Sequence, residues 1–89
     1  PCSEVALLQF HIASIHSGRE DFSEALKGFN NALSIFSKLE GEKAKKGAAH
    51  TLANIAHLYR SLGDLQKSEE HVEQALAIYY DFGLNEEIL

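Results

Sequence analysis

The chain is poor in several residue types, and each scarcity excludes something. It has one cysteine, one proline, no methionine and no tryptophan in 89 residues. The lone Cys2 cannot form an internal disulfide or build a cysteine zinc site, which favours a reducing, intracellular and cytoplasmic setting. Without a long apolar run or a charged-then-apolar leader, we expect neither a membrane span nor a signal peptide. The start at Pro1 fits removal of an initiator methionine and fits excision from a longer protein equally well.

Positive charge is scarce as well. Eight Lys and Arg residues against thirteen Asp and Glu residues give a net charge of −5. That sign is wrong for a protein that binds along a phosphate backbone, so we expect no nucleic-acid partner. Half of the basic side chains gather around one stretch, which we interpret as a solvated turn between helices: Lys38, Lys43, Lys45 and Lys46.

Apolar residues recur at spacings of three and four, and no alternating segment is present, which predicts an all-α fold. The first helix spans about 3–17, the second begins at Asp21 and continues to Gly41, residues 42–46 lead into a third that Gly63 ends, and the fourth lies between Asp64 and Gly83. Because short connections make consecutive helices antiparallel, the predicted architecture is two stacked antiparallel helical hairpins, a fragment of an α-solenoid. Residues 85–89 resemble the start of a further helix.

Several local features of these helices are also predicted. Asp21 and Glu24 have the spacing of a capping pair, and Asp64 caps the fourth helix. Gly28 marks a close approach between two helices. The first helix carries an apolar stripe of Val5, Leu8, Ile12 and Ile15. The third is expected to bury Ala48, Ala49, Leu52, Ile55, Ala56, Tyr59 and Leu62, and the fourth Leu65, Val72, Ala75, Leu76, Ile78 and Tyr79.

The chain contains one pattern twice, at a separation of 43 residues. Ala6, Ile12, Ala13, Asp21, Ala32, Leu33 and Ile35 fall on Ala49, Ile55, Ala56, Asp64, Ala75, Leu76 and Ile78. A period between about 20 and 50 residues indicates stacked repeats, in which one unit buries its apolar face against the next. We therefore assign 1–42 to a first repeat, 43–84 to a second and 85–89 to the start of a possible further helix. Such an architecture favours binding over catalysis.

The second copy resembles a tetratricopeptide repeat. That family has a large apolar residue, an apolar-small pair and an aromatic on its first helix, then a Gly-Asp turn and small residues on its second helix. The residues that carry the resemblance are Leu52, Ile55, Ala56, Tyr59, Gly63, Asp64, Ser68, Val72 and Ala75. The first copy keeps Ile12, Ala13, Phe22, Ala25, Phe29 and Ala32 but departs from the pattern at Gln9, His16 and Glu20.

The resemblance implies a function. A period of 43 exceeds the usual value of about 34 and is similar to the long-helix variety found in scaffold and motor-cargo adaptor proteins. The family implies a non-enzymatic protein-protein interaction module that holds a partner peptide in a concave groove, with no cofactor. The side chains expected to line that groove come from the first and third helices: Phe10, Ser14, His50, Ala53, Asn54, His57 and Arg60. Leu7 and Phe10 either form an apolar floor for a partner's anchor residue or pack against another repeat.

Alternatives stay open. The chain is either a peptide-binding module or a structural, self-assembling segment of a longer array, for instance a homodimer, with no ligand of its own. One branch of the family clamps a terminal carboxylate with lysines and asparagines. Asn54 matches that clamp, but Phe10 and Ser14 stand where a lysine and another asparagine are needed, which disfavours it.

The five histidines suggest a helical metal-binding bundle as a third reading. His50 and His57 lie seven residues apart, about 10 Å along a helix, which is too far for one ion with ligand bonds of about 2 Å. A pairing of histidines from different helices stays open, but we expect no metal site. Because no Ser/His/Asp arrangement has supporting motif context, we also expect no catalytic residues. Because a free imidazole titrates at about pH 6.5, a groove with His50, His57 and Arg60 is expected to hold acidic peptide more strongly as the pH falls.

Overall fold

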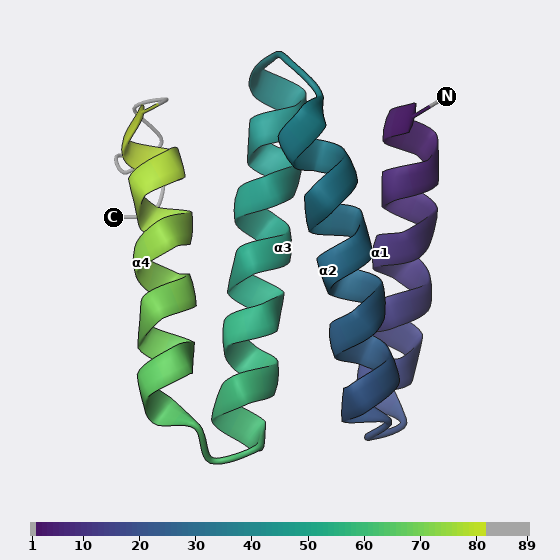
Figure 1. Cartoon of the computed structure of the whole chain (residues 1–89), viewed down its shortest axis with the longest axis vertical. Coiled ribbons are helices and arrows are strands. Elements are labelled where there is room, and N and C mark those ends of the chain that lie inside the picture. The colour runs from purple at the N-terminus through teal and green to yellow at the C-terminus, as the bar shows by residue number, and fades with distance from the viewer. Residues whose placement is uncertain (1, 82–89) are drawn as a thin grey trace.

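The computed structural model describes residues 2–81, which form four α-helices (Figure 1). They are α1 (Cys2–Gly18), α2 (Phe22–Lys38), α3 (Glu42–Ser61) and α4 (Leu65–Asp81). α1 packs on α2 and α3 packs on α4, while α2 and α3 join the two hairpins, so α1 and α4 lie at opposite edges of the stack (Figure 1). The predicted all-α fold of stacked antiparallel hairpins is confirmed.

The connection between the hairpins is shorter than predicted. α2 ends at Lys38 and does not continue to Gly41, and residues 42–46 form the first turn of α3. Leu39 is extended, and Gly41 has φ 106°, a left-handed value that favours glycine. The chain therefore reverses within three residues. The predicted end of the fourth helix at Gly83 and the further helix over 85–89 lie outside the described residues.

Small side chains set the distance between the helices. Ala6, Ala13, Ala25 and Ala32 are fully buried between α1 and α2. A Cβ atom built on Gly28 of α2 would lie 2.9 Å from the Cβ of Ala13 on α1, so the close approach predicted at Gly28 is confirmed. Two buried clusters join the hairpins, one containing Ala6, Ala32, Phe36, Ala44 and Ala48 and the other Ala13, Ala25, Phe29, Ile55 and Leu58.

Several apolar positions are exposed, including some on α3 and α4 that the sequence pattern predicted to be buried. The α1 stripe is exposed, at 48% for Val5, 59% for Leu8, 43% for Ile12 and 57% for Ile15. On α4 the side chains of Leu65, Val72 and Leu76 are likewise exposed, and so is Leu62 at the end of α3. Periodicity identifies an apolar face but does not say whether a neighbour covers it. Within residues 2–81, α1 and α4 are the edge helices of the stack.

The turns that close the two hairpins have the same hydrogen bonds. The amide of Asp21 donates to the carbonyl of His16 at 2.8 Å, and the amide of Asp64 donates to the carbonyl of Tyr59 at 2.8 Å. Glu20, at φ 65°, takes the left-handed position that Gly63, at φ 86°, takes in the second turn. The first hairpin therefore has the same turn conformation as the second, with Glu20 in place of the glycine.

The two aspartates differ in what their side chains do. Asp64 caps α4 as predicted, because its Oδ1 accepts from the amide of Lys67 at 3.1 Å. The capping pair predicted at Asp21 and Glu24 is wrong, since the side chain of Asp21 makes no cap hydrogen bond. It lies instead 3.6 Å from Nδ1 of His16 on α1.

Candidate peptide-binding pocket

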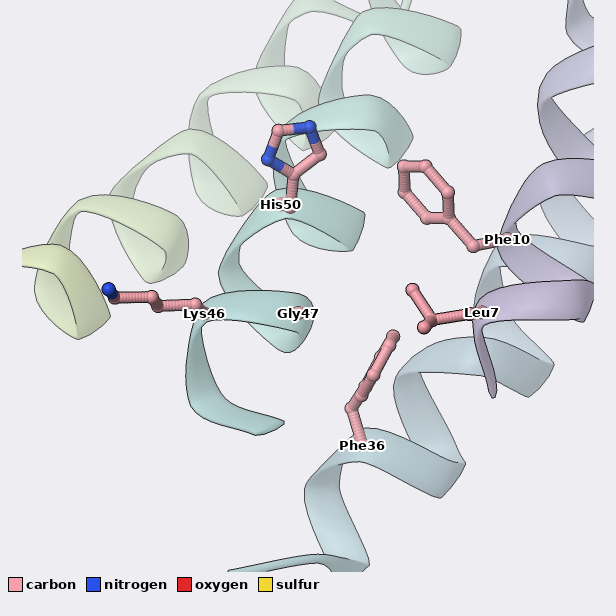
Figure 2. Close-up of a pocket in the computed structure, with 6 residues that line it drawn as sticks. All are labelled: Leu7, Phe10, Phe36, Lys46, Gly47 and His50. Carbon is pink, nitrogen blue, oxygen red and sulfur yellow. The ribbon is translucent and has the colours of Figure 1, made fainter. Parts of the chain in front are cut away.

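An open apolar pocket lies where α1 faces α3 across the end of α2 (Figure 2). Its volume is about 230 Å³, and its lining consists of Leu7 and Phe10 from α1, Phe36 from α2, and Lys46, Gly47 and His50 from α3. Leu7, Phe10 and Phe36 converge on the space in front of Gly47 (Figure 2). We call this the α1–α3 pocket.

Phe36 and Gly47 determine the shape of the α1–α3 pocket. Phe36 is buried, and its ring lies so close to the α3 backbone that a Cβ atom at position 47 would force the ring to shift. A second hollow of about 190 Å³ continues the pocket past Leu7, Phe36 and Gly47 to Lys43 and Ala44. The glycine thus leaves an apolar trough open towards the first turn of α3.

Phe10 belongs both to the core and to the pocket wall. Its ring packs edge-on against Phe29, with 5.4 Å between ring centroids, and the centroid of His50 lies 5.7 Å away across the pocket. Phe10 is half-buried, whereas Leu7 keeps 48% of its surface exposed. The structure therefore brings together two of the predicted groove residues, Phe10 and His50.

Two other predicted groove residues use part of their hydrogen-bonding capacity on their own helices. The hydroxyl of Ser14 donates to the carbonyl of Phe10 at 3.0 Å, and the side-chain amide of Asn54 donates to the carbonyl of His50 at 2.9 Å. These bonds hold both side chains against the helix. The Oδ1 atom of Asn54 and the hydroxyl oxygen of Ser14 keep lone pairs with which they can accept from a ligand.

The remaining predicted groove residues lie further along α3. Ala53, His57 and Arg60 are exposed, and none of them lines the α1–α3 pocket. Together with Asn54 they continue from the pocket towards the C-terminal end of α3, at steps of three and four residues. That all seven predicted residues act as one binding surface stays a prediction.

The walls of the α1–α3 pocket are mostly apolar. Lys46 points away from the pocket in Figure 2, and its Nζ lies 3.4 Å from Oε2 of Glu42 one turn earlier on α3. His50 supplies the polar ring at the rim. The pocket therefore suits an apolar group, with polar contacts available at its edge and along α3.

Sequence reasoning missed Phe36 and Gly47 as parts of the site. Phe36 lies in the buried core, and nothing in its local sequence shows that it would also line a pocket. Gly47 was a usable signal, because glycine inside a helix is unfavourable and often marks a close approach.

Among residues 2–81, no group of three or more His, Cys, Asp or Glu side chains is placed to hold a metal ion. Within the same range, no helix combines the length and the apolar composition that a bilayer crossing requires.

Comparisons with known proteins agree with the fold of stacked helical hairpins. The profile of the family described as Tetratricopeptide repeat matches residues 4–81. A protein of Arabidopsis thaliana named Protein KINESIN LIGHT CHAIN-RELATED 1 is 34% identical over 77 residues, which is 86% of this chain and 12% of that relative's length. The chain thus spans a small part of the relative. No solved structure matches.

Proposed function

This chain belongs to the tetratricopeptide repeat family, and from that premise we propose that it is a non-enzymatic adaptor module that binds a peptide of a partner protein in the α1–α3 pocket and along α3. Repeats of this family generally mediate protein-protein interaction. A scaffold or adaptor role is also in keeping with the name of the plant relative, which links that protein to kinesin light chains.

The observation that carries the proposal is the convergence of Leu7 and Phe10 with Gly47 and His50 on one open, apolar pocket. Binding energy between proteins concentrates in a few apolar anchors that enter well-packed pockets. The α1–α3 pocket, at about 230 Å³, has room for one large apolar side chain of a ligand. We propose that such an anchor enters between Phe10 and Phe36.

Polar contacts outside the pocket would orient the rest of the peptide. Asn54 offers its free Oδ1 to a backbone amide of the ligand, and Arg60 offers donors to carbonyl or carboxylate oxygens. Ala53, which is exposed and has no bulk, leaves space for the peptide to lie against α3. The seven residues of this proposed surface are Phe10, Ser14, His50, Ala53, Asn54, His57 and Arg60.

A peptide-library screen on three proteins tests the proposal. The first is the unaltered chain, and the second is Ala53→Arg, which places a long side chain over the proposed peptide path. The third is Ala77→Arg, a matched control because Ala77 is also exposed but lies on α4. We expect the same peptides to bind the unaltered chain and Ala77→Arg, and to be lost from Ala53→Arg. Peptides retained by Ala53→Arg, or no binders at all, contradict the proposal.

A further inference from the structure

Both edges of the stack present apolar side chains to solvent. On α1 they are Val5, Leu8, Ile12 and Ile15, which we call the α1 outer face. On α4 they are Leu65, Val72, Leu76 and Tyr80, with half-buried Tyr79 beside them, which we call the α4 outer face. The two helices lie at opposite edges of the molecule (Figure 1). Contiguous exposed apolar patches mark interaction sites in soluble proteins.

The second repeat shows which helix covers the positions that are equivalent to the α1 outer face. Moving 43 residues along the chain takes Val5, Leu8, Ile12 and Ile15 to Ala48, Thr51, Ile55 and Leu58. In the second hairpin all four positions are buried, at 7% exposure or less. Ile55 and Leu58 share a core cluster with Phe29 of α2. The α1 outer face is therefore the counterpart of the α3 face that α2 covers.

The α4 outer face has the opposite counterpart. Val72, Leu76 and Tyr79 correspond to Phe29, Leu33 and Phe36 of α2. Phe29 and Phe36 are buried, and Leu33 packs against both core clusters that join the hairpins. Thus the α4 outer face corresponds to the face of α2 that contacts α3, and the α1 outer face corresponds to the face of α3 that contacts α2. Within the chain, these two faces of α2 and α3 pack against each other.

The sizes of the side chains at the two edges also match. Relative to α2, the α4 outer face is smaller, since Val72 replaces Phe29. Relative to α3, the α1 outer face is larger, since Leu8 replaces Thr51 and Val5 replaces Ala48. The smaller side chains of the α4 outer face would therefore meet larger side chains on the α1 outer face, so the total side-chain volume in the contact stays near that of the α2–α3 contact. Cores tolerate changes of residue best when total volume is kept.

We propose that the α4 outer face of one molecule binds the α1 outer face of a second copy of this chain, in the arrangement that joins α2 to α3. The contact is head to tail, so each added copy leaves one outer face of each kind free and the assembly stays open. This inference concerns the edges of the stack and does not depend on peptide binding in the α1–α3 pocket.

One residue weakens the contact relative to its internal counterpart. Glu69 on α4 stands at the position of Leu26 on α2, and Leu26 packs against the second core cluster. Association would partly desolvate this exposed carboxylate, which opposes binding. The proposed contact is therefore weaker than the α2–α3 contact and sensitive to what occupies position 69.

Sedimentation equilibrium with two blocked variants tests the contact. Ile12→Arg blocks the α1 outer face and Val72→Arg blocks the α4 outer face, and both residues are more than 40% exposed, so each variant is expected to keep its helicity by circular dichroism. The apparent molecular mass of the unaltered chain should increase with its concentration, because association follows mass action. Each variant alone should stay monomeric, whereas an equimolar mixture should reach twice the monomer mass and stop there, because one intact face of each kind remains.

Because a blocked variant could lose association by misfolding, a variant that strengthens the contact is tested as well. Glu69→Leu should tighten association about tenfold, while Glu70→Leu, which changes the neighbouring exposed carboxylate at the position equivalent to exposed Lys27, should not. The proposal is overturned if Val72→Arg alone still dimerises, which would mean that two α1 faces bind each other. It is also overturned if the blocked variants fail to combine, or if the unaltered chain and Glu69→Leu both remain monomeric at every concentration.

Discussion

The ring of Phe36 lies directly against the backbone of Gly47. A Cβ atom built at position 47 would be 2.6 Å from Cε1 of Phe36 and 2.8 Å from Cδ1 and Cζ, all closer than real side chains approach. The pair therefore fixes how closely the two hairpins pack and, at the same time, the shape of the α1–α3 pocket, which both residues line.

Gly47→Ala should destabilise the fold and narrow the α1–α3 pocket. Alanine raises helix propensity by about 1 kcal/mol but forces overpacking that costs about 1–3 kcal/mol, so we expect a net loss of about 1 kcal/mol in the free energy of unfolding. Urea denaturation measures it. Gly18→Ala is the control, because a Cβ at Gly18 meets nothing within 4 Å. Equal effects of the two substitutions would contradict the packing assigned to Phe36.

Gly28 and Ala13 should show coupled effects on stability. Gly28→Ala places a methyl group against Ala13 and is expected to push α1 away from α2, and Ala13→Gly alone loses about 1 kcal/mol of helix propensity. In the double variant the methyl group has only changed sides. We therefore expect the double variant to lose less stability than the sum of the single losses in a double-mutant cycle. Additive losses would mean that the two positions do not touch.

Glu20→Gly should stabilise the first hairpin. A left-handed conformation costs a non-glycine residue about 1–2 kcal/mol, which Glu20→Gly removes. Glycine also gives the unfolded chain more conformational freedom, which offsets part of this gain, so we expect the free energy of unfolding to rise by about 0.5–1 kcal/mol. The reverse exchange, Gly63→Glu, should lower the melting temperature for the same reason. A melting temperature that Glu20→Gly leaves unchanged or lowers would speak against the backbone conformation at that turn.

Asp64→Ala should destabilise α4 more than Asp21→Ala destabilises α2. Asp64 accepts a hydrogen bond from the amide of Lys67, and losing such a cap costs about 1 kcal/mol. Asp21 makes no cap bond, and its contact with half-buried His16, at 3.6 Å, contributes less than about 1 kcal/mol. Thermal unfolding followed by circular dichroism compares the two variants. The opposite order would show that Asp21 is the functioning cap.

Local signals in the sequence predicted the helices and their pairing well. The Gly63 and Asp64 pair marks a turn by its own chemistry, and Ile55 and Ala56 lie on a face that the structure buries. The boundary near Gly41 was predicted less accurately, because helix ends depend on which residue leaves the helical conformation, and Leu39 does so before the glycine is reached.

The parts of the site that sequence could not predict depend on contacts between distant residues. Phe10 and His50 are forty residues apart, and only the stacking of the hairpins brings their rings to 5.7 Å. In the same way, Leu8 and Ile12 have the pattern of a buried face, yet whether they are covered depends on a neighbour that the residues themselves do not specify. Periodicity identifies an apolar face, but only the packing of the helices shows whether that face is buried.

The most direct test of peptide binding is an NMR titration of the ¹⁵N-labelled chain with a peptide selected by the library screen. We predict that the amide shifts change around Leu7 and Phe10 on α1 and from Gly47 to Asn54 on α3, and that the outer faces of α1 and α4 stay unchanged. Shift changes confined to Leu8, Ile12, Val72 and Leu76 would place the ligand on the edges of the stack and would contradict the account of the α1–α3 pocket.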